Sequence, residues 1–171
     1  MQHSELNALW LKQRRNDQAW HHQLVGSAIS LRNSVRDVLK PDPSTWQDLN
    51  TKAKNEYVEV IDFYGLDKPI RGDVRNLSAG SAGILVYGIA VTFDSGPDSY
   101  PKQDIYIPVA SRLIGDSAEY ALFDRDKDSP DNNWHNDVDA FTRKLVQRLA
   151  EYLSHNAFDG FDKRQTFGFI R

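Results

Sequence analysis

The sequence predicts an α+β fold in which an antiparallel sheet of four to five strands packs against a long N-terminal helical region and a C-terminal helix. Three observations lead to this prediction. The apolar run 83–93 is rich in β-branched and aromatic residues, which is typical of a central strand. Apolar residues recur at helical spacing before Pro41, and a second helical stripe follows Asn136. We therefore expect helices at both ends of the chain and strands between them.

Length and composition restrict the class of protein. The chain has 171 residues, 40% of them hydrophobic and 26% charged, as expected for one soluble domain. We expect a single α+β domain over 1–171, with a helical region at 1–41 and the sheet and remaining helices at 44–171. The chain has no cysteine, which excludes disulfides, thiolate nucleophiles and Cys-ligated zinc. Because no signal-peptide pattern or membrane-length apolar segment occurs, we expect a cytoplasmic protein that does not enter a membrane.

The N-terminal region is predicted to be helical from about residue 4 to residue 40, where Pro41 stops it. Its second half carries apolar residues at alternating spacings of four and three, as in the seam of a coiled coil. The stretch 13–18 is entirely polar, which predicts a break or an exposed stretch, and so one helix or two. The seam has two interpretations, packing on the chain's own sheet or pairing with another protein or a second copy as a homodimer. The candidate interaction residues on it are Leu24, Leu31, Val35 and Val38.

The middle of the chain is predicted to form most of the sheet. Ser44 with Gln47 matches a capping box, so we expect a short helix to about Asn55 before the first strand. Pro108 cannot donate a ladder hydrogen bond, which predicts an edge or bulged strand around it. The aromatic tail 158–171 is expected to pack, and it supplies the fifth strand if one is present. The four strands expected from alternation and turn signals are 57–63, 84–93, 104–110 and 118–123.

The C-terminal helix has the clearest helical pattern in the chain. Asn136, with Asp139 three residues later, is predicted to cap its start. The apolar stripe that follows is Val138, Phe141, Leu145, Leu149, Tyr152 and Leu153.

An acidic segment lies between the last predicted strand and this helix. Residues 116–139 hold eight Asp or Glu against two Lys or Arg. Asp124, Asp126 and Asp128 stand at every second position, which resembles the first ligands of an EF-hand calcium loop. Ser129 stands where that loop has glycine, and His135 stands where it has its final glutamate. We therefore consider a divalent-cation site with looser geometry than an EF-hand. Its candidate ligands are Asp124, Asp126, Asp128, Asp131 and His135. The simpler interpretation is a solvated turn whose carboxylates favour the next helix N-terminus.

No catalytic residue is assigned, because neither a phosphate loop nor a nucleophile elbow occurs in the sequence. The leading hypothesis is a small soluble interaction module of the inhibitor, immunity or adaptor type that binds a protein partner or itself. In that role Asp126, Asp128 and Asp131 would attract a basic partner.

Two alternatives remain open. The first is a divalent-metal-dependent enzyme or metal-binding protein that uses the acidic segment. The second is binding of single-stranded nucleic acid through the basic and aromatic residues near both ends of the chain. The sequence pI of about 5.9 disfavours nucleic acid. The residues this second alternative would use are Lys12, Arg14 and Arg15 with Trp10, Trp20, His21 and His22, and Lys163, Arg164 and Arg171 in the tail.

Overall fold

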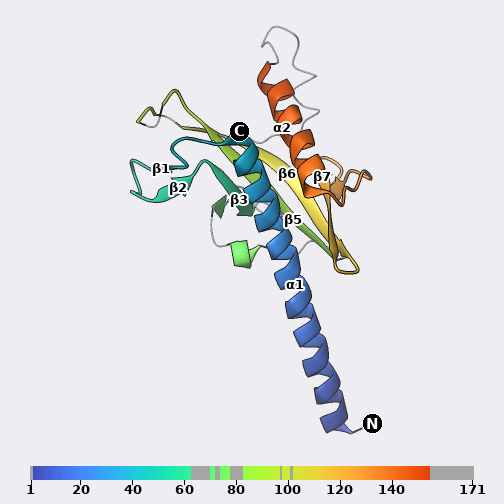
Figure 1. Ribbon diagram of the computed structural model, residues 1–171. Helices are drawn as coiled ribbons and strands as arrows, with labels where there is room; N and C mark the ends of the chain where they lie inside the picture. The colour runs from blue at the N-terminus through green and yellow to red at the C-terminus, as the bar shows by residue number, and fades with distance from the viewer. Residues whose placement is uncertain are drawn as a thin grey trace.

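The computed structural model is α+β, with a long N-terminal helix, a C-terminal helix, a curled antiparallel sheet of six strands and a separate two-stranded sheet (Figure 1). It describes residues 2–62, 70–71, 74–77, 83–96, 98–100 and 102–154. The fold class is as predicted, but the structure has more strands than the four to five expected, because β1, β2, β4 and β8 are short. The order of the large sheet is β4-β3-β5-β6-β7-β8.

Helix α1 spans His3–Leu39 without interruption, so residues 13–18 form an exposed stretch and not a break. These six residues are polar, but none is glycine or proline, and their cost in a helix is small. The helix ends as Pro41 predicts: Lys40 takes a left-handed conformation, and its N–H donates to the carbonyl oxygen of Arg36 at 2.8 Å. The N-terminal half of α1 extends well beyond the rest of the molecule in Figure 1.

Strand β5, Ile84–Phe93, is the centre of the sheet and has the predicted bounds. It pairs on one side with β3, Val58–Asp62, and along its whole length with β6, Gln103–Ile114. β7, Ser117–Asp124, follows β6 through a turn in which Gly115 has a φ of +59°. The two outermost strands, β4 and β8, are Ile70–Arg71 and Ser129–Pro130.

Both helices cover one face of this sheet, where the main core lies. Alternate residues of β5 such as Tyr87 and Ile89 are fully buried there, against Leu24 and Leu31 of α1 and Phe141 of α2. The buried Tyr87 hydroxyl and the Oγ atom of Ser111 are 2.8 Å apart and form a hydrogen bond, so its polar atom is satisfied. A smaller cluster on the other sheet face comprises Val86, Ala110 and Phe123.

Helix α2, Val138–Ser154, packs beside α1. Its cap is Asp137 and not the predicted Asn136, because the Oδ1 atom of Asp137 accepts hydrogen bonds from the N–H groups of Asp139 and Ala140. Asp139 instead joins the two helices, since its Oδ1 atom accepts a hydrogen bond from the Ser34 hydroxyl at 2.9 Å. The predicted stripe is largely buried, but Leu153 is 50% exposed.

The prediction of a helix from Ser44 to about Asn55 is wrong. The segment is a hairpin of β1, Thr45–Gln47, and β2, Lys54–Glu56. The Oδ1 atom of Asp48 accepts hydrogen bonds from the N–H groups of Asn50 and Thr51, which closes a turn instead of starting a helix. The capping-box pattern of Ser44 and Gln47 is a local signal for a helix start. Pairing between β1 and β2 determines the conformation instead.

The edge or bulged position predicted for Pro108 is also wrong. Strand β6 lies between β5 and β7, and Pro108 is opposite Gly88 of β5. The register of β6 with β7 begins only at Val109, so no residue of β7 is paired with Pro108. A central strand therefore accommodates this proline at the point where one of its two ladders ends.

No helix among the described residues is long and apolar enough to cross a membrane. The aromatic tail 158–171, for which packing was predicted, lies outside the described residues.

Two leucines of α1 provide a matched test of the packing. Leu31 is 0% exposed and Leu11 is 40% exposed. Leu31→Ala is expected to lower the free energy of unfolding by about 2–5 kcal/mol, because it leaves a cavity between α1 and the sheet. Leu11→Ala should change it by less than about 0.5 kcal/mol. Urea unfolding of both variants measures this, and equal effects would contradict the packing of α1 described above.

Candidate functional site

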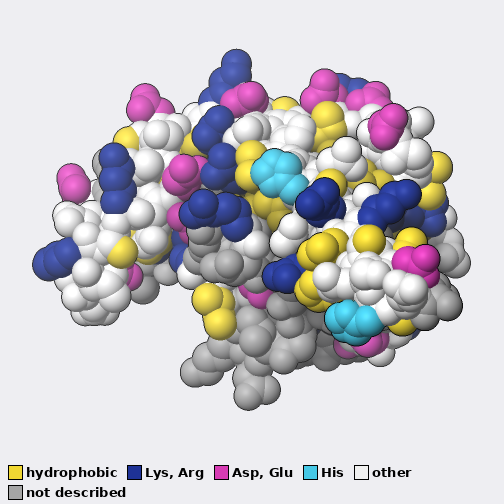
Figure 2. All heavy atoms as spheres, turned by 90° about the horizontal axis from the view of Figure 1, so that it is seen from below, with side chains coloured by type: hydrophobic (Ala, Val, Ile, Leu, Met, Phe, Trp, Pro, Cys, Tyr) yellow, Lys and Arg dark blue, Asp and Glu magenta, His cyan; other side chains and the backbone are white. Residues whose placement is uncertain are grey.

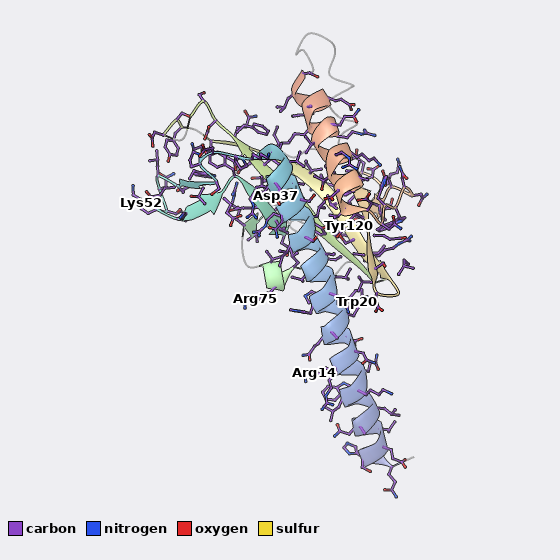
Figure 3. The ribbon with its side chains drawn as sticks, in the orientation of Figure 1. Arg14, Trp20, Asp37, Lys52, Arg75 and Tyr120 are labelled. Atoms are coloured by element: carbon purple, nitrogen blue, oxygen red, sulfur yellow. The ribbon has the colours of Figure 1, made fainter. Side chains whose placement is uncertain are left out.

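The most distinctive surface is the part of α1 that extends past the sheet. Residues 2–19 are all exposed, and Trp20 is the first residue of the helix that packs on the core (Figure 3). We call residues 3–19 the projecting segment. At about 1.5 Å per residue it is about 26 Å long. Four large apolar side chains lie on it, with exposed fractions of 50% for Leu6, 58% for Leu9, 54% for Trp10 and 40% for Leu11.

Three of these side chains share one side of the helix. Leu9 and Trp10 follow Leu6 by three and four positions, so the three side chains form one stripe, which we call the projecting stripe. Continued at the same spacing through Gln13, Asp17 and Trp20, this stripe reaches the buried Leu24. The face that packs on the sheet in the second half of α1 is therefore the face left open in the first half. Leu11 lies on the other side of the helix.

The candidate interaction residues of the seam are located mainly in the core. Leu24 and Leu31 are 0% exposed and Val35 is 1% exposed, and all three pack inside this chain. This is the first of the two interpretations of the seam, packing on the chain's own sheet. Val38 is 48% exposed near the end of the helix. The exposed apolar side chains of α1 thus lie chiefly on its first half, outside the predicted set of interaction residues.

Charges surround the projecting stripe. The projecting segment holds Lys12, Arg14 and Arg15 against Glu5 and Asp17. The guanidinium of Arg14 lies over the ring of Trp10, 5.4 Å from its centroid. Figure 2, which views the end of the molecule from which α1 projects, shows hydrophobic side chains there with Lys and Arg beside them.

The start of the helix is capped by its own residues. The Oε2 atom of Glu5 accepts a hydrogen bond from the Gln2 N–H at 2.7 Å, and the Glu5 N–H donates to the Gln2 carbonyl oxygen at 3.1 Å. This cap places a carboxylate at the end of the segment where the helix dipole is positive, which stabilises the first turn.

A hollow of about 420 Å³ lies at the base of the projecting segment, between α1 and the 3₁₀ turn η1, Val74–Asn76. Arg14 and Arg75 approach it from these two elements (Figure 3). The Nε2 atom of His21 is 3.5 Å from the carbonyl oxygen of Arg75, so α1 and η1 are in contact there. The residues around the hollow are Arg14, Asp17, Gln18, His21, His22, Val25 and Arg75.

A second notable cluster lies near the β1–β2 hairpin and surrounds Lys102, whose side chain is only 3% exposed. Its Nζ atom forms an ion pair with Asp94, and the Tyr57 hydroxyl donates to the same carboxylate at 2.5 Å. The ammonium also lies over three rings, 5.0 Å from the centroid of Tyr100, 5.6 Å from Tyr57 and 5.9 Å from Trp46.

These contacts set the protonation states in the cluster. The hydrogen bond from Lys102, followed by that from Tyr57, holds the pKa of Asp94 below its ordinary value. Burial disfavours the charge on Lys102, but the bonds to Asp94 and Tyr57 outweigh it and raise its pKa. Burial and the bond to Asp94 raise the pKa of Tyr57. Lys102 is thus held as a cation, which is the wrong protonation state for a nucleophile or base.

Arg71 extends this cluster along the sheet. It forms ion pairs with Glu59 and, at 2.6 Å, with Asp104, and its guanidinium lies 5.7 Å from the centroid of Trp46. Trp46 of the hairpin therefore lies near two cations, Arg71 and Lys102, that are themselves paired with carboxylates. We interpret the cluster as the attachment of the β1–β2 hairpin to the large sheet.

Residues 125–128 of the acidic segment form the turn between β7 and β8. The Oδ1 atom of Asp124 accepts hydrogen bonds from the N–H groups of Asp126 and Lys127, and its Oδ2 atom is 2.9 Å from the Lys127 ammonium. Asp126 and Asp128 are exposed. A role for Asp126, Asp128 and Asp131 in attracting a basic partner stays a prediction.

Asp131 and His135 both contact the Lys144 ammonium. They do not come together with the carboxylates of the β7–β8 turn to form a metal site. The Lys144 ammonium lies 4.0 Å from the Oδ2 atom of Asp131 and 3.1 Å from the Nε2 atom of His135. The His135 ring also packs 5.4 Å from the ring of Phe141, centroid to centroid. No three His, Cys, Asp or Glu side chains within the described ranges lie close enough to hold a metal ion. The geometry gives the divalent-site hypothesis no support.

The structure does not bring the candidate nucleic-acid-binding residues together on one surface of the described chain. Arg14 and Arg15 are adjacent in α1 and so point about 100° apart. The tail residues Lys163, Arg164 and Arg171 lie outside the described residues. Binding of single strands also stays a prediction.

Comparison of this chain with protein-family models, with curated proteins and with solved structures gives no match.

The cluster around Lys102 generates a pH-dependent prediction. Because the pKa of Asp94 is lowered by folding, its carboxylate stabilises the fold above the ordinary value of 3.8, and this contribution is lost as the pH falls through the lowered pKa. Asp94→Asn is therefore expected to lower the melting temperature at pH 7, with a deficit that shrinks below about pH 4. Thermal melting between pH 7 and pH 3 measures it, with the exposed Asp116→Asn as control. A deficit independent of pH would contradict this role.

Proposed function

We propose that this protein is a protein-interaction module and that the projecting segment of α1 is its docking element. The observation that carries the proposal is the exposure of Leu6, Leu9 and Trp10, each at least 50%, on one side of a helix with no neighbour from the described part of this chain. Isolated apolar side chains on a surface are ordinary, but three on one helical stripe favour a binding surface.

The stability of the segment also supports docking. A helix of this length is marginal in water unless one of its faces is packed. The projecting segment is joined to a buried half, which lowers the cost of nucleation, but it has no packing of its own within the described structure. A partner that covers the projecting stripe would bury apolar area and stabilise the helix at the same time.

The chemistry of the surface indicates what kind of partner fits. Trp10 and two leucines would supply the apolar centre, and tryptophan is one of the residues that most often dominate binding energy. Lys12, Arg14 and Arg15 beside them favour a partner with carboxylates next to its own apolar residues. A partner helix with an apolar stripe and flanking acidic residues meets both requirements.

Site-specific photo-crosslinking tests this proposal. A benzophenone amino acid at Leu9 is expected to form a covalent adduct with a protein partner when the full-length chain is irradiated at its native concentration in its source cells. The matched control is the same amino acid at Ile114, which is 56% exposed but lies at the end of β6. Adducts from position 9 and none from position 114 would agree with the proposal. No adduct from position 9, or equal labelling from both positions, would refute it.

A further inference from the structure

We propose that the hollow at the base of the projecting segment is a binding site for a small organic phosphate, a compound in which a phosphate group is attached to a flat or apolar body. This inference goes beyond the proposed function, because none of the three residues of the projecting stripe lines the hollow. It rests on the charge, the arrangement and the size of the hollow.

Positive charge predominates around the hollow. Arg14 and Arg75 supply two guanidinium groups, and Asp17 is the only carboxylate among the described residues that line it. His21 and His22 add two imidazole rings, each of which carries an N–H donor. Hydrogen-bond donors with an excess of positive charge favour an anionic ligand.

Arg14 differs from the arginines of the sheet because no carboxylate neutralises it. Arg71 and Arg112 each form ion pairs with carboxylates of other strands. Within the described residues Arg14 forms no ion pair, and its contact is with the ring of Trp10. Stacking on a ring leaves the N–H groups at the edge of a guanidinium uncovered. Arg14 is therefore held in place by Trp10 and keeps its donors for a ligand.

The two arginines reach the hollow from different elements, which favours a phosphate over a carboxylate. Arg14 comes from α1 and Arg75 from η1 (Figure 3), and the contact of His21 with the Arg75 carbonyl oxygen joins these elements. A carboxylate has two oxygens in one plane, and a single guanidinium binds both. A phosphate monoester has three terminal oxygens and a charge of about −1.5 to −2 at pH 7, so it accepts from donors on two sides.

The hollow is too large for a phosphate group alone. Its volume of about 420 Å³ lies within the range of about 300–1,000 Å³ that is typical of small-molecule sites. Val25, which is 4% exposed, gives it an apolar base. From Arg14 to Val25 the side of α1 that lines the hollow is about 16 Å long. This space accommodates an organic body beside the phosphate.

Titration of the full-length protein with phenyl phosphate, observed by NMR of the backbone amides, tests the site. We expect saturable shifts of the amides near Arg14, His22 and Arg75, with a dissociation constant of about 0.1–3 mM. Benzoate has the same ring with a carboxylate, and inorganic phosphate has no ring. Each of these two probes should bind at least about fivefold more weakly than phenyl phosphate, because each lacks one of the two parts that the hollow fits.

Two neighbouring arginines of α1 provide matched variants. Arg14→Gln removes a guanidinium that lines the hollow, and it should weaken the binding of phenyl phosphate at least about fivefold. Arg15→Gln removes the same charge from the next position, which points about 100° away, and should weaken binding less than about twofold. Both residues are exposed on a continuous helix, so neither change disturbs the core.

Two further variants separate the hollow from its surroundings. Asp17→Asn removes the carboxylate from the lining and should strengthen the binding of phenyl phosphate by about twofold to fivefold. Leu9→Ala shortens a side chain of the projecting stripe, outside the hollow, and should leave the dissociation constant of phenyl phosphate unchanged.

Any of four results would overturn the inference. They are no saturable shift up to about 20 mM phenyl phosphate, shifts confined to amides away from the hollow, equal weakening by Arg14→Gln and Arg15→Gln, and binding of benzoate or inorganic phosphate as tight as that of phenyl phosphate. The photo-crosslinking at position 9 concerns a different surface, so its result and the result of this titration are independent.

Discussion

The packing of α1 against the sheet is the interaction on which the rest of the structure depends. Leu24, Ala28 and Leu31 are 0% exposed, and they fix the second half of the helix across the face of β3, β5 and β6. Because a helix already nucleated in the core extends at little cost, the same interaction supports the projecting segment. The anchored half therefore determines both the core and the direction in which the exposed apolar residues point.

Much of the fold could be predicted because its signals are local. The strand β5 follows from one alternating apolar run, and the stripe of Phe141, Leu145 and Leu149 predicted α2. The β1–β2 hairpin could not be predicted in this way. Its residues carry a helix-start pattern, and what decides the conformation is pairing between Thr45–Gln47 and Lys54–Glu56, together with the turn closed by Asp48.

The candidate site was predicted only in part, for a physical reason. The apolar seam of α1 was predicted at Leu24 to Val38. The point at which the sheet ends beneath the helix depends on strand length and register, and the helix sequence carries no information about these. The apolar character of Leu6, Leu9 and Trp10 therefore does not by itself distinguish them from the buried Leu24. The polar stretch 13–18 was the one local signal that the two halves of the helix differ, and it marks the exposed part correctly.

The two halves of α1 present the same amphipathic face, which is buried on the sheet in the second half and exposed on the projecting segment. The most direct measurement is hydrogen exchange of the backbone amides of residues 6–19, compared with the amides near Leu31 in the isolated protein. Fast exchange of residues 6–19 together with strong protection near Leu31 is the predicted result. Equal protection of the two stretches would contradict a projecting segment that has no packing of its own.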